Sequence, residues 1–367
     1  MTNSSLSPTA TPQQPATPQQ TATPQQPATP QQPAGSLMAA EVAEQPAVLR
    51  RILTDGVAEI AEVAAEIGRV APRFVLFAAR GTSDHAALYA KYLTEIRLGR
   101  PAGLASPSST TVYGARPDLS DVLYVAVSQS GGSPDLVDSV AAARECGAMT
   151  VAVTNNPSSP LAAAALRHID VRAGAELAVA ATKTYSAELL ALFLLLGGPK
   201  AAAEAAGLAD AAEETLADPA PLEAAARYRY ADRLVTTARG YSYPTAREAA
   251  LKLMETSYLS AQAFSGADLL HGPLAMLDSG VPVIAVVSPG RGGAAMAPVI
   301  ERLNQSGSDV LQVGSSAGLP IASAGLAEEL LPILEILPLQ RLAWRLALDR
   351  GENPDRPRGL AKVTQTW

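Results

Sequence analysis

The chain has 367 residues, a formal net charge of −7, 48% hydrophobic residues and 17% charged residues. This composition is typical of a soluble globular protein with room for two domains, and the negative charge argues against a nucleic-acid partner held through its phosphates. The single cysteine, Cys146, excludes a disulfide framework and a cysteine-based zinc cluster, and no segment resembles a membrane span or a signal peptide, so we expect a cytoplasmic protein without a membrane partner.

The N-terminal segment, residues 1–36, differs in composition from everything that follows. Pro-Gln-Gln recurs at residues 12–14, 18–20, 24–26 and 30–32, in a segment built mainly from Ala, Thr, Pro and Gln. Such a segment cannot bury a core and is predicted to be disordered with polyproline II character. We therefore expect deletion of residues 1–36 to leave turnover unchanged in a steady-state assay, and a large loss of turnover in the truncated protein would contradict this expectation.

From Met38 onward, strand and helix patterns alternate as in a parallel sheet with crossover helices. The predicted strands are residues 74–77, 123–127 and 150–154, and the predicted helices are residues 85–97, 134–146 and 186–196. A weakly patterned, alanine-rich stretch at 200–222 is expected to join this half of the chain to the next.

The second half of the chain repeats the first. Ala79-Arg80-Gly81-Thr82-Ser83 reappears about 160 residues later as Ala238-Arg239-Gly240-Tyr241-Ser242, each time after an apolar strand pattern and before a helix pattern. One doubly wound α/β unit is therefore predicted to be duplicated. The predicted boundaries are 38–199 for the first half, 223–345 for the second half and 346–367 for a C-terminal tail.

The segment Val127–Ser133 follows an apolar strand pattern and precedes a helix that begins near Pro134. Backbone N–H groups at such a turn, together with serine hydroxyls, form an anion site, and the absence of a Walker lysine favours a small phosphomonoester over a nucleoside triphosphate. The alternative is a serine-rich helix cap without a ligand. In the second half the corresponding residues are Ser288-Pro289-Gly290, so only the first half is predicted to hold phosphate.

The helix pattern that begins near Pro244 carries a candidate general base. Lys252 and Glu255 lie three residues apart and therefore on one face of the helix. A carboxylate beside a lysine at the edge of an α/β sheet can abstract a proton. The alternative is that Lys252 pairs with Glu248, four residues earlier, while Glu255 is a solvated surface charge.

Among the three histidines, His271 is the best candidate for a functional role. It lies in a turn closed by Gly272-Pro273. His85 begins a helix pattern and His168 is predicted to lie in a charged turn, so both have weaker claims.

Motifs in a fixed order then point to a family. They are Gly81-Thr82-Ser83, Ser128-Gln129-Ser130-Gly131, Val179-Ala180-Ala181-Thr182-Lys183, Leu251-Lys252-Leu253-Met254-Glu255, His271-Gly272-Pro273-Leu274, Pro338-Leu339-Gln340 and Pro357-Arg358-Gly359-Leu360-Ala361-Lys362. From about residue 38 to the end, the chain resembles tandem SIS (sugar isomerase) proteins. It is similar to the isomerase half of glucosamine-6-phosphate synthase and to stand-alone SIS-type glucosamine-6-phosphate deaminases. The resemblance implies two flavodoxin-like, three-layer subdomains.

The resemblance also implies a role for each matching residue. Glu255 matches the base that moves a proton between C1 and C2 of the opened sugar, with Lys252 beside it. His271 matches the ring-opening histidine, which a neighbouring subunit of a homodimer donates, and Lys362 matches a C-terminal lysine that closes over the sugar, so the C-terminus is expected against the site. No metal or organic cofactor is implied. The residues implied to contact the amino-sugar phosphate are Thr82, Ser83, Ser128, Gln129, Ser130 and Ser133, with the backbone of Val179 and Ala361.

Differences from the synthase pattern set the expected reaction. The N-terminal repeats and the position of Cys146 argue against a glutaminase domain, so deamination and isomerisation of glucosamine 6-phosphate is the leading expectation. In the synthase pattern, lysines occupy the positions of Met254 and Leu270 and a glutamate that of Asp268, so the pocket is expected to have less positive charge, more apolar surface and room for an N-acetyl group. Dehydration of N-acetylglucosamine 6-phosphate, through the same Glu255, is therefore an alternative. A non-catalytic sugar-phosphate sensor is a further one.

Overall fold

The structure is a computed structural model in which residues 1, 32–316 and 318–362 are described. The tail predicted to be disordered lies almost wholly outside the described residues. The chain divides into the units Met1–Pro33 and Ala34–Trp367, and all elements given below belong to the second unit. None of the helices in the described part of the chain could span a lipid bilayer.

The first half forms a sheet of five parallel strands in the order β2-β1-β3-β4-β5. The three apolar runs predicted to be strands are at its centre, where Val125 pairs with Phe77 on one side and with Val151 on the other. His168 lies in the edge strand rather than in a turn, where it pairs with Ala152 of the neighbouring strand. Its Nε2 is 2.8 Å from Thr154 Oγ1 on that strand. The strands are β1 (Phe74–Ala78), β2 (Ala102–Leu104), β3 (Val122–Ser128), β4 (Met149–Thr154) and β5 (Arg167–Asp170).

Helices cover both faces of this sheet. One face packs on α6 and α7, with the short helix α5 against α6, and the other packs on α3, α4 and α8. Residues 36–56, at the start of the unit, form α1, α2 and a turn of π-helix that leads into α3. The helix bounds are α1 (Ser36–Ala43), α2 (Gln45–Arg51), α3 (Val57–Val70), α4 (Thr82–Arg97), α5 (Pro107–Thr111), α6 (Pro134–Glu145), α7 (Pro160–Ala164) and α8 (Lys183–Leu196).

The second half forms a sheet of four parallel strands in the order β7-β6-β8-β9, so β6, β7, β8 and β9 repeat the order of β1 to β4. The predicted duplication of a doubly wound unit is therefore confirmed. The strands are β6 (Arg233–Ala238), β7 (Ser260–Ser265), β8 (Val283–Val286) and β9 (Val310–Val313), and the helices are α12 (Tyr243–Ser257), α13 (Gly266–Leu270), α14 (Arg291–Ala294), α15 (Ala297–Gln305) and α16 (Leu331–Asp349).

The linking stretch at 200–222 contains helices, which its weak pattern did not predict. Alanine has the highest helix propensity, and α10 gains stability by packing against α2 and α16. The three linking helices are α9 (Ala201–Glu204), α10 (Leu208–Ala217) and α11 (Ala220–Ala225).

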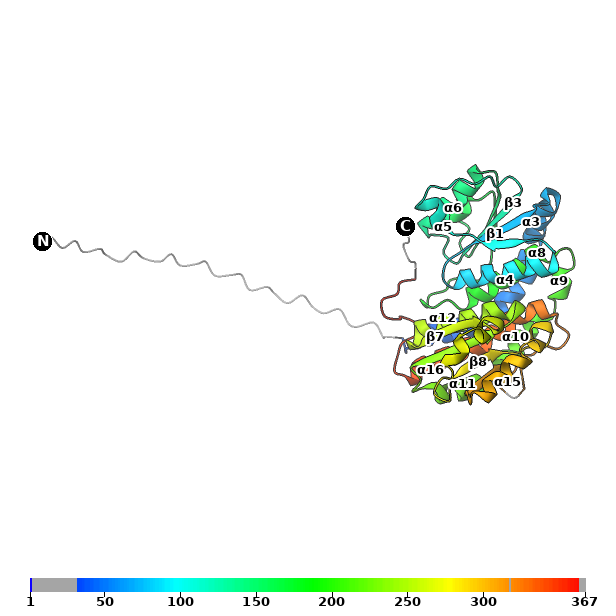
Figure 1. The fold of residues 1–367 in the computed structure, drawn as a ribbon. Helices are drawn as coiled ribbons and strands as arrows, with labels where there is room; N and C mark the ends of the chain where they lie inside the picture. Colours follow the sequence, from blue (N-terminus) through cyan, green and yellow to red (C-terminus); the bar gives the residue numbers. More distant parts are fainter. Residues whose placement is uncertain (2–31, 317, 363–367) are drawn as a thin grey trace. The chain divides into compact units, whose positions relative to one another are not determined.

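Helices from both halves pack between the two sheets (Figure 1), where α4 contacts α8 and α12, and α12 contacts α16. Every residue of α8 is buried, as expected for a helix that is apolar on all sides. Gln340 on α16 joins the halves, because its Nε2 donates to Thr182 O at 3.2 Å and its Oε1 accepts from Gln45 Nε2 at 2.8 Å. These bonds fix the start of α8, which leads into the site described below.

The duplication extends to a pair of buried acids. In the first half Ser83 Oγ lies 2.9 Å from Glu188 Oε1 on α8, and in the second half Ser242 Oγ lies 2.7 Å from Glu335 Oε1 on α16. Both glutamates are buried. Glu188 Oε2 has no hydrogen-bond partner among the described residues, whereas the hydroxyls of Ser288 and Thr245 also act on Glu335. Burial raises the pKa of both carboxyl groups, that of Glu335 to about 7.

Glu335 should make the protein less stable as the pH rises. Its folded-state pKa is above its value of 4.5 in the unfolded chain, so the folded state binds the proton more tightly, and the free energy of unfolding should fall by about 3 kcal/mol between pH 4.5 and 7. We expect Glu335→Gln to remove this loss, and therefore to be more stable than the wild type at pH 8 and equally stable near pH 4.5. Urea unfolding at several pH values measures this, with the exposed Glu62→Gln as control; parallel wild-type and Glu335→Gln curves would contradict it.

Candidate functional site

A cavity of about 300 Å³ lies where β1 and β3 end. The chain leaves β1 toward β2 on one side and enters β3 on the other, so the cavity is at the switch point of the sheet, where ligands bind in doubly wound folds. Its volume is that of a small-molecule site. Segments from both halves line it: residues 80–83 after β1, 128–133 after β3, 179–184 before α8, Glu255 near the end of α12, and residues 360–362.

All residues predicted to contact the sugar phosphate line this one cavity, together with Glu255 and Lys362. They come from segments far apart in the sequence. The sugar-phosphate set is Thr82, Ser83, Ser128, Gln129, Ser130, Ser133, Val179 and Ala361.

The loop after β3 is a tight turn whose last serine does not cap the helix that follows, and its Gly132 N–H donates to Ser130 Oγ at 3.2 Å. Ser133 occupies the N-cap position of α6, but its side chain makes no capping hydrogen bond, so its hydroxyl is available to the cavity. Gly131 has φ of 62°, and a Cβ atom there would lie 2.3 Å from Ser159 Oγ, so only glycine fits the turn. Within the loop, Ser128 Oγ accepts from the Gly131 N–H at 3.2 Å.

Arg80 adds a positive charge at the edge of this cavity. Its Nη2 atom lies 2.6 Å from Asp135 Oδ2, and Asp135 is buried in the first turn of α6. The pair joins the loop after β1 to the helix that follows the serine loop. The sequence motif alone gave no reason to single out Arg80.

The two predicted arrangements of Lys252 occur together. Lys252 Nζ lies 2.5 Å from Glu255 Oε2 and 3.4 Å from Glu248 Oε1, and it donates to Thr82 Oγ1 at 3.1 Å. Burial alone would lower the pKa of Lys252, but the two carboxylates raise it above its ordinary value, so the buried ammonium stays charged. Glu255 is not a solvated surface charge, because it lines the cavity and its side chain is only 21% exposed.

Glu248 is at the centre of this cluster. Its Oε1 accepts from Thr82 Oγ1 at 3.0 Å, and its Oε2 lies 2.7 Å from His85 Nδ1. Burial acts to raise the pKa of Glu248, but Lys252 and His85 outweigh that effect and hold the pKa below its ordinary value. Sequence reasoning treated Glu248 only as a competitor for Lys252 and His85 only as the start of a helix.

A second buried carboxylate holds the C-terminal segment against the cavity. Glu176 accepts from the N–H groups of Thr182 and Thr184 at 2.9 and 3.1 Å, and from Lys362 Nζ at 2.9 Å. Lys362 also donates to the carbonyl oxygen of Ala178 at 2.7 Å. The C-terminal segment therefore reaches the cavity through residue 362, and residues 363–367 lie outside the described part. No motif pointed to Glu176.

His271 lies outside this cavity. It follows α13, it is exposed, and its N–H donates to Asp268 O at 3.0 Å. Within one chain it does not line the cavity that contains Glu255, so its action from a neighbouring subunit stays a prediction. Among residues 32–316 and 318–362, no group of three or more acidic, histidine or cysteine side chains is arranged to hold a metal ion.

The SIS domain model matches residues 71–196 and 228–327, which is more than half of the chain. The chain belongs to the SIS domain family. It is 34% identical over 338 residues to an isomerizing glutamine–fructose-6-phosphate aminotransferase of Methanothermobacter thermautotrophicus, and the match covers 89% of this chain but only 56% of that relative.

Two solved structures are similar to this SIS protein. A candidate phosphosugar isomerase of Silicibacter pomeroyi DSS-3 has 33% identity and a TM-score of 0.79, over 87% of this chain and 99% of that one. A glucosamine-6-phosphate deaminase of Thermotoga maritima has 22% identity and a TM-score of 0.74, over 90% of this chain and 100% of that one, and this likeness concerns the fold.

In the second SIS half, the loop that corresponds to the serine loop already holds a carboxylate of the chain itself. Glu328 accepts from the N–H of Arg291 at 2.8 Å and from the N–H of Gly292 at 2.7 Å. A Cβ atom at Gly290 would lie 2.3 Å from the Glu328 side chain, so the loop closes tightly on it. The prediction that only the first half holds phosphate thus has a structural reason beyond the loss of the serines.

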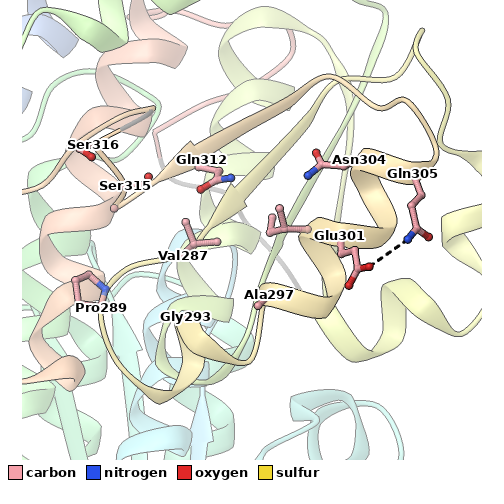
Figure 2. Close-up of a pocket in the computed structure, with 12 residues that line it drawn as sticks. Val287, Pro289, Gly293, Ala297, Glu301, Asn304, Gln305, Gln312, Ser315 and Ser316 are labelled. Carbon is pink, nitrogen blue, oxygen red and sulfur yellow. Dashed lines mark hydrogen bonds between the residues drawn. The ribbon is translucent and has the colours of Figure 1, made fainter.

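A larger hollow of about 920 Å³ also lies in the second SIS half, between the loop after β8, helix α15 and the loop after β9. In Figure 2 its polar side chains lie apart along α15, β9 and the loop after β9, and two of them, Glu301 and Gln305, are hydrogen-bonded to each other. None of the predicted site residues lines it. We therefore place the candidate site at the smaller cavity.

Proposed function

We propose that this protein is an enzyme that acts on hexosamine 6-phosphates, and that its reaction is the deamination and isomerisation of glucosamine 6-phosphate to fructose 6-phosphate. The observation that carries the proposal is that Glu255 and the loop 128–133 line the same cavity of about 300 Å³. An anion site on one wall and a carboxylate on another are what an enzyme needs to hold a phosphate and move a proton elsewhere on the same small molecule.

The chemistry follows from the charges around Glu255. Glu255 takes the proton from C2 of the open-chain sugar and returns it to C1, so the C2 amine becomes an imine that water hydrolyses to a ketone and ammonia. Negative charge develops on the C1 oxygen during the first transfer, and the cation of Lys362, which lines the cavity, stabilises it. Lys252 is buried outside the cavity and holds Glu255 in place through their 2.5 Å contact. His271 of a second copy opens the sugar ring, so the active form is a homodimer. The protein acts in the cytoplasm.

Relatives support the class of reaction. The chain is similar to an aminotransferase whose name includes isomerisation of fructose 6-phosphate and to a candidate phosphosugar isomerase. The chain spans little more than half of that aminotransferase, so the use of glutamine does not transfer with the likeness.

Dehydration of N-acetylglucosamine 6-phosphate is the second candidate, because a further cavity of about 460 Å³ adjoins the first at Arg80 and Gly81. Leu251, Met254 and Ala263 form an apolar part of its lining that suits an acetyl group, beside the charged Asp84 and Arg247. In that reaction Glu255 removes the C2 proton, and the C3–O bond breaks as the C2–C3 double bond forms, so that one water leaves.

A substrate panel tests the proposal. We expect stoichiometric ammonia and fructose 6-phosphate from glucosamine 6-phosphate, and no product with Glu255→Gln. No ammonia at high enzyme concentration would contradict deamination. Loss of one water from N-acetylglucosamine 6-phosphate, seen by mass spectrometry, would establish the second candidate instead. Tight binding of sugar phosphates without turnover of any hexosamine would identify a sensor.

A further inference from the structure

Ser83 has a single hydroxyl hydrogen, and two neighbours compete for it. One is a ligand oxygen in the cavity, which Ser83 lines, and the other is Glu188 Oε1 at 2.9 Å. An ionised Glu188 is only an acceptor and would take the hydrogen of Ser83, whereas a neutral Glu188 can donate one of its own. A phosphate oxygen without a proton is also only an acceptor, so it needs Ser83 as a donor.

The surroundings of Glu188 favour the neutral form. Glu188 belongs to α8 and its side chain is buried in the protein. The charged groups that act on it are the carboxylates of Glu176 and Glu248. Burial and these two like charges raise the pKa of Glu188 well above its ordinary value. No cation is bonded to Glu188 among the described residues, in contrast to Glu176 and Glu248, which contact Lys362 and Lys252.

A neutral Glu188 has one place for its proton. On Oε2 the O–H would be buried with no partner among residues 32–316 and 318–362, at a cost of about 1–3 kcal/mol. On Oε1 the O–H would face Ser83 Oγ, which lies 2.9 Å away and would then accept it. The Ser83 hydrogen is then free to point into the cavity.

We propose that Glu188 is a positioning residue of the phosphate site, which donates its proton to Ser83 and so directs the Ser83 hydroxyl hydrogen at the bound phosphate. The inference rests on the proposed function insofar as the cavity holds a phosphate. It does not depend on which reaction follows. It assigns a functional role to an acid that neither touches the ligand nor belongs to the cluster around Lys252.

The chain contains a matched control for this role. Ser242 and Glu335 repeat the pair in the second half, with a similar distance and the same burial, although the hydroxyls of Ser288 and Thr245 also act on Glu335. The loop beside them holds the carboxylate of Glu328 in place of a ligand. A substitution of Glu335 therefore reproduces the structural effect of losing a buried acid but should leave phosphate affinity unchanged.

Isothermal titration of the full-length protein with fructose 6-phosphate and with inorganic phosphate tests the proposal. We expect Glu188→Met to weaken both by about tenfold, the value of one lost oriented hydrogen bond. Glu188→Gln, which still donates to Ser83 through its amide, should restore affinity to within about threefold, and Glu335→Met should bind as the wild type does. Thermal unfolding checks that each variant is folded.

A double-mutant cycle separates action through Ser83 from a general structural effect. If Glu188 acts through Ser83, then Ser83→Ala with Glu188→Met should bind no more weakly than Ser83→Ala alone. Three results would each overturn the proposal. They are losses of affinity that multiply in the Ser83→Ala, Glu188→Met double variant, equal losses in Glu188→Met and Glu335→Met, and wild-type affinity in Glu188→Met. A wild type that binds neither probe would overturn the phosphate site and this inference together, whereas a wild type that binds both but releases no ammonia would contradict only deamination.

Discussion

Glu255→Gln should lower kcat by about 10²–10⁴-fold and abolish solvent deuterium incorporation at C2 of the sugar. The substitution keeps the shape of the side chain in the cavity, but it replaces the carboxylate, which can accept the C2 proton, by a neutral amide, which cannot. Deamination and dehydration both begin with removal of the C2 proton, so the loss of exchange is expected for either reaction. NMR or mass spectrometry of sugar recovered from deuterated water measures it.

A matched control for this variant is Glu95→Gln. Glu95 is also an ion-paired helical glutamate, 2.7 Å from Lys91 Nζ, but it lies outside the cavity. We expect it to keep wild-type turnover and exchange. Exchange at C2 that survives in Glu255→Gln, in a protein with a wild-type melting temperature, would show that another group is the base.

The architecture was predictable because its signals are local. The apolar runs at 74–77, 123–127 and 150–154 are buried in the sheet, and strands of that kind need no information from elsewhere in the chain. The repeat of residues 79–83 as residues 238–242 likewise predicted a second parallel sheet, which the structure contains. The link at 200–222 was the exception, because its helices gain their stability from packing against α2 and α16 and not from a strong pattern of their own.

The candidate site was predictable only where motifs carried it. Family motifs pointed to the serine loop and to Glu255, but the contact between His85 and Glu248 joins residues 163 apart in the sequence, and no local pattern marks it. The same holds for Glu188, because no local pattern distinguishes it within an otherwise largely apolar helix. Charges buried between elements are set by tertiary packing, so they become visible only when the helices are placed together.

Lys252 carries the other large expected effect, on stability as well as on activity. It is the cation between two carboxylates, with its side chain 1% exposed and that of Glu248 fully buried. Removing one partner of a buried ion pair leaves an uncompensated charge, so Lys252→Met should lower the free energy of unfolding at pH 7.5 by about 3–5 kcal/mol. Lys91→Met, which breaks a partly exposed pair with Glu95, should cost less than about 1 kcal/mol.

The pH dependence of the Lys252→Met effect distinguishes lost charge compensation from lost packing. In the wild type the pKa of Glu248 is below its unfolded value, so its interactions stabilise the fold above that value and are lost as the pH falls through the folded pKa. In Lys252→Met the carboxylate of Glu248 keeps its contacts with Thr82 and His85 but loses its buried ammonium partner. It therefore binds a proton more readily in the folded state than in the wild type, and the variant loses relative stability as the pH rises. The difference between the two proteins should therefore shrink from pH 7.5 to pH 4.5 in urea unfolding, and Glu248→Gln should restore part of the stability of Lys252→Met at pH 7.5. A difference that is constant with pH and unaffected by Glu248→Gln would mean that Lys252 stabilises the protein by packing alone.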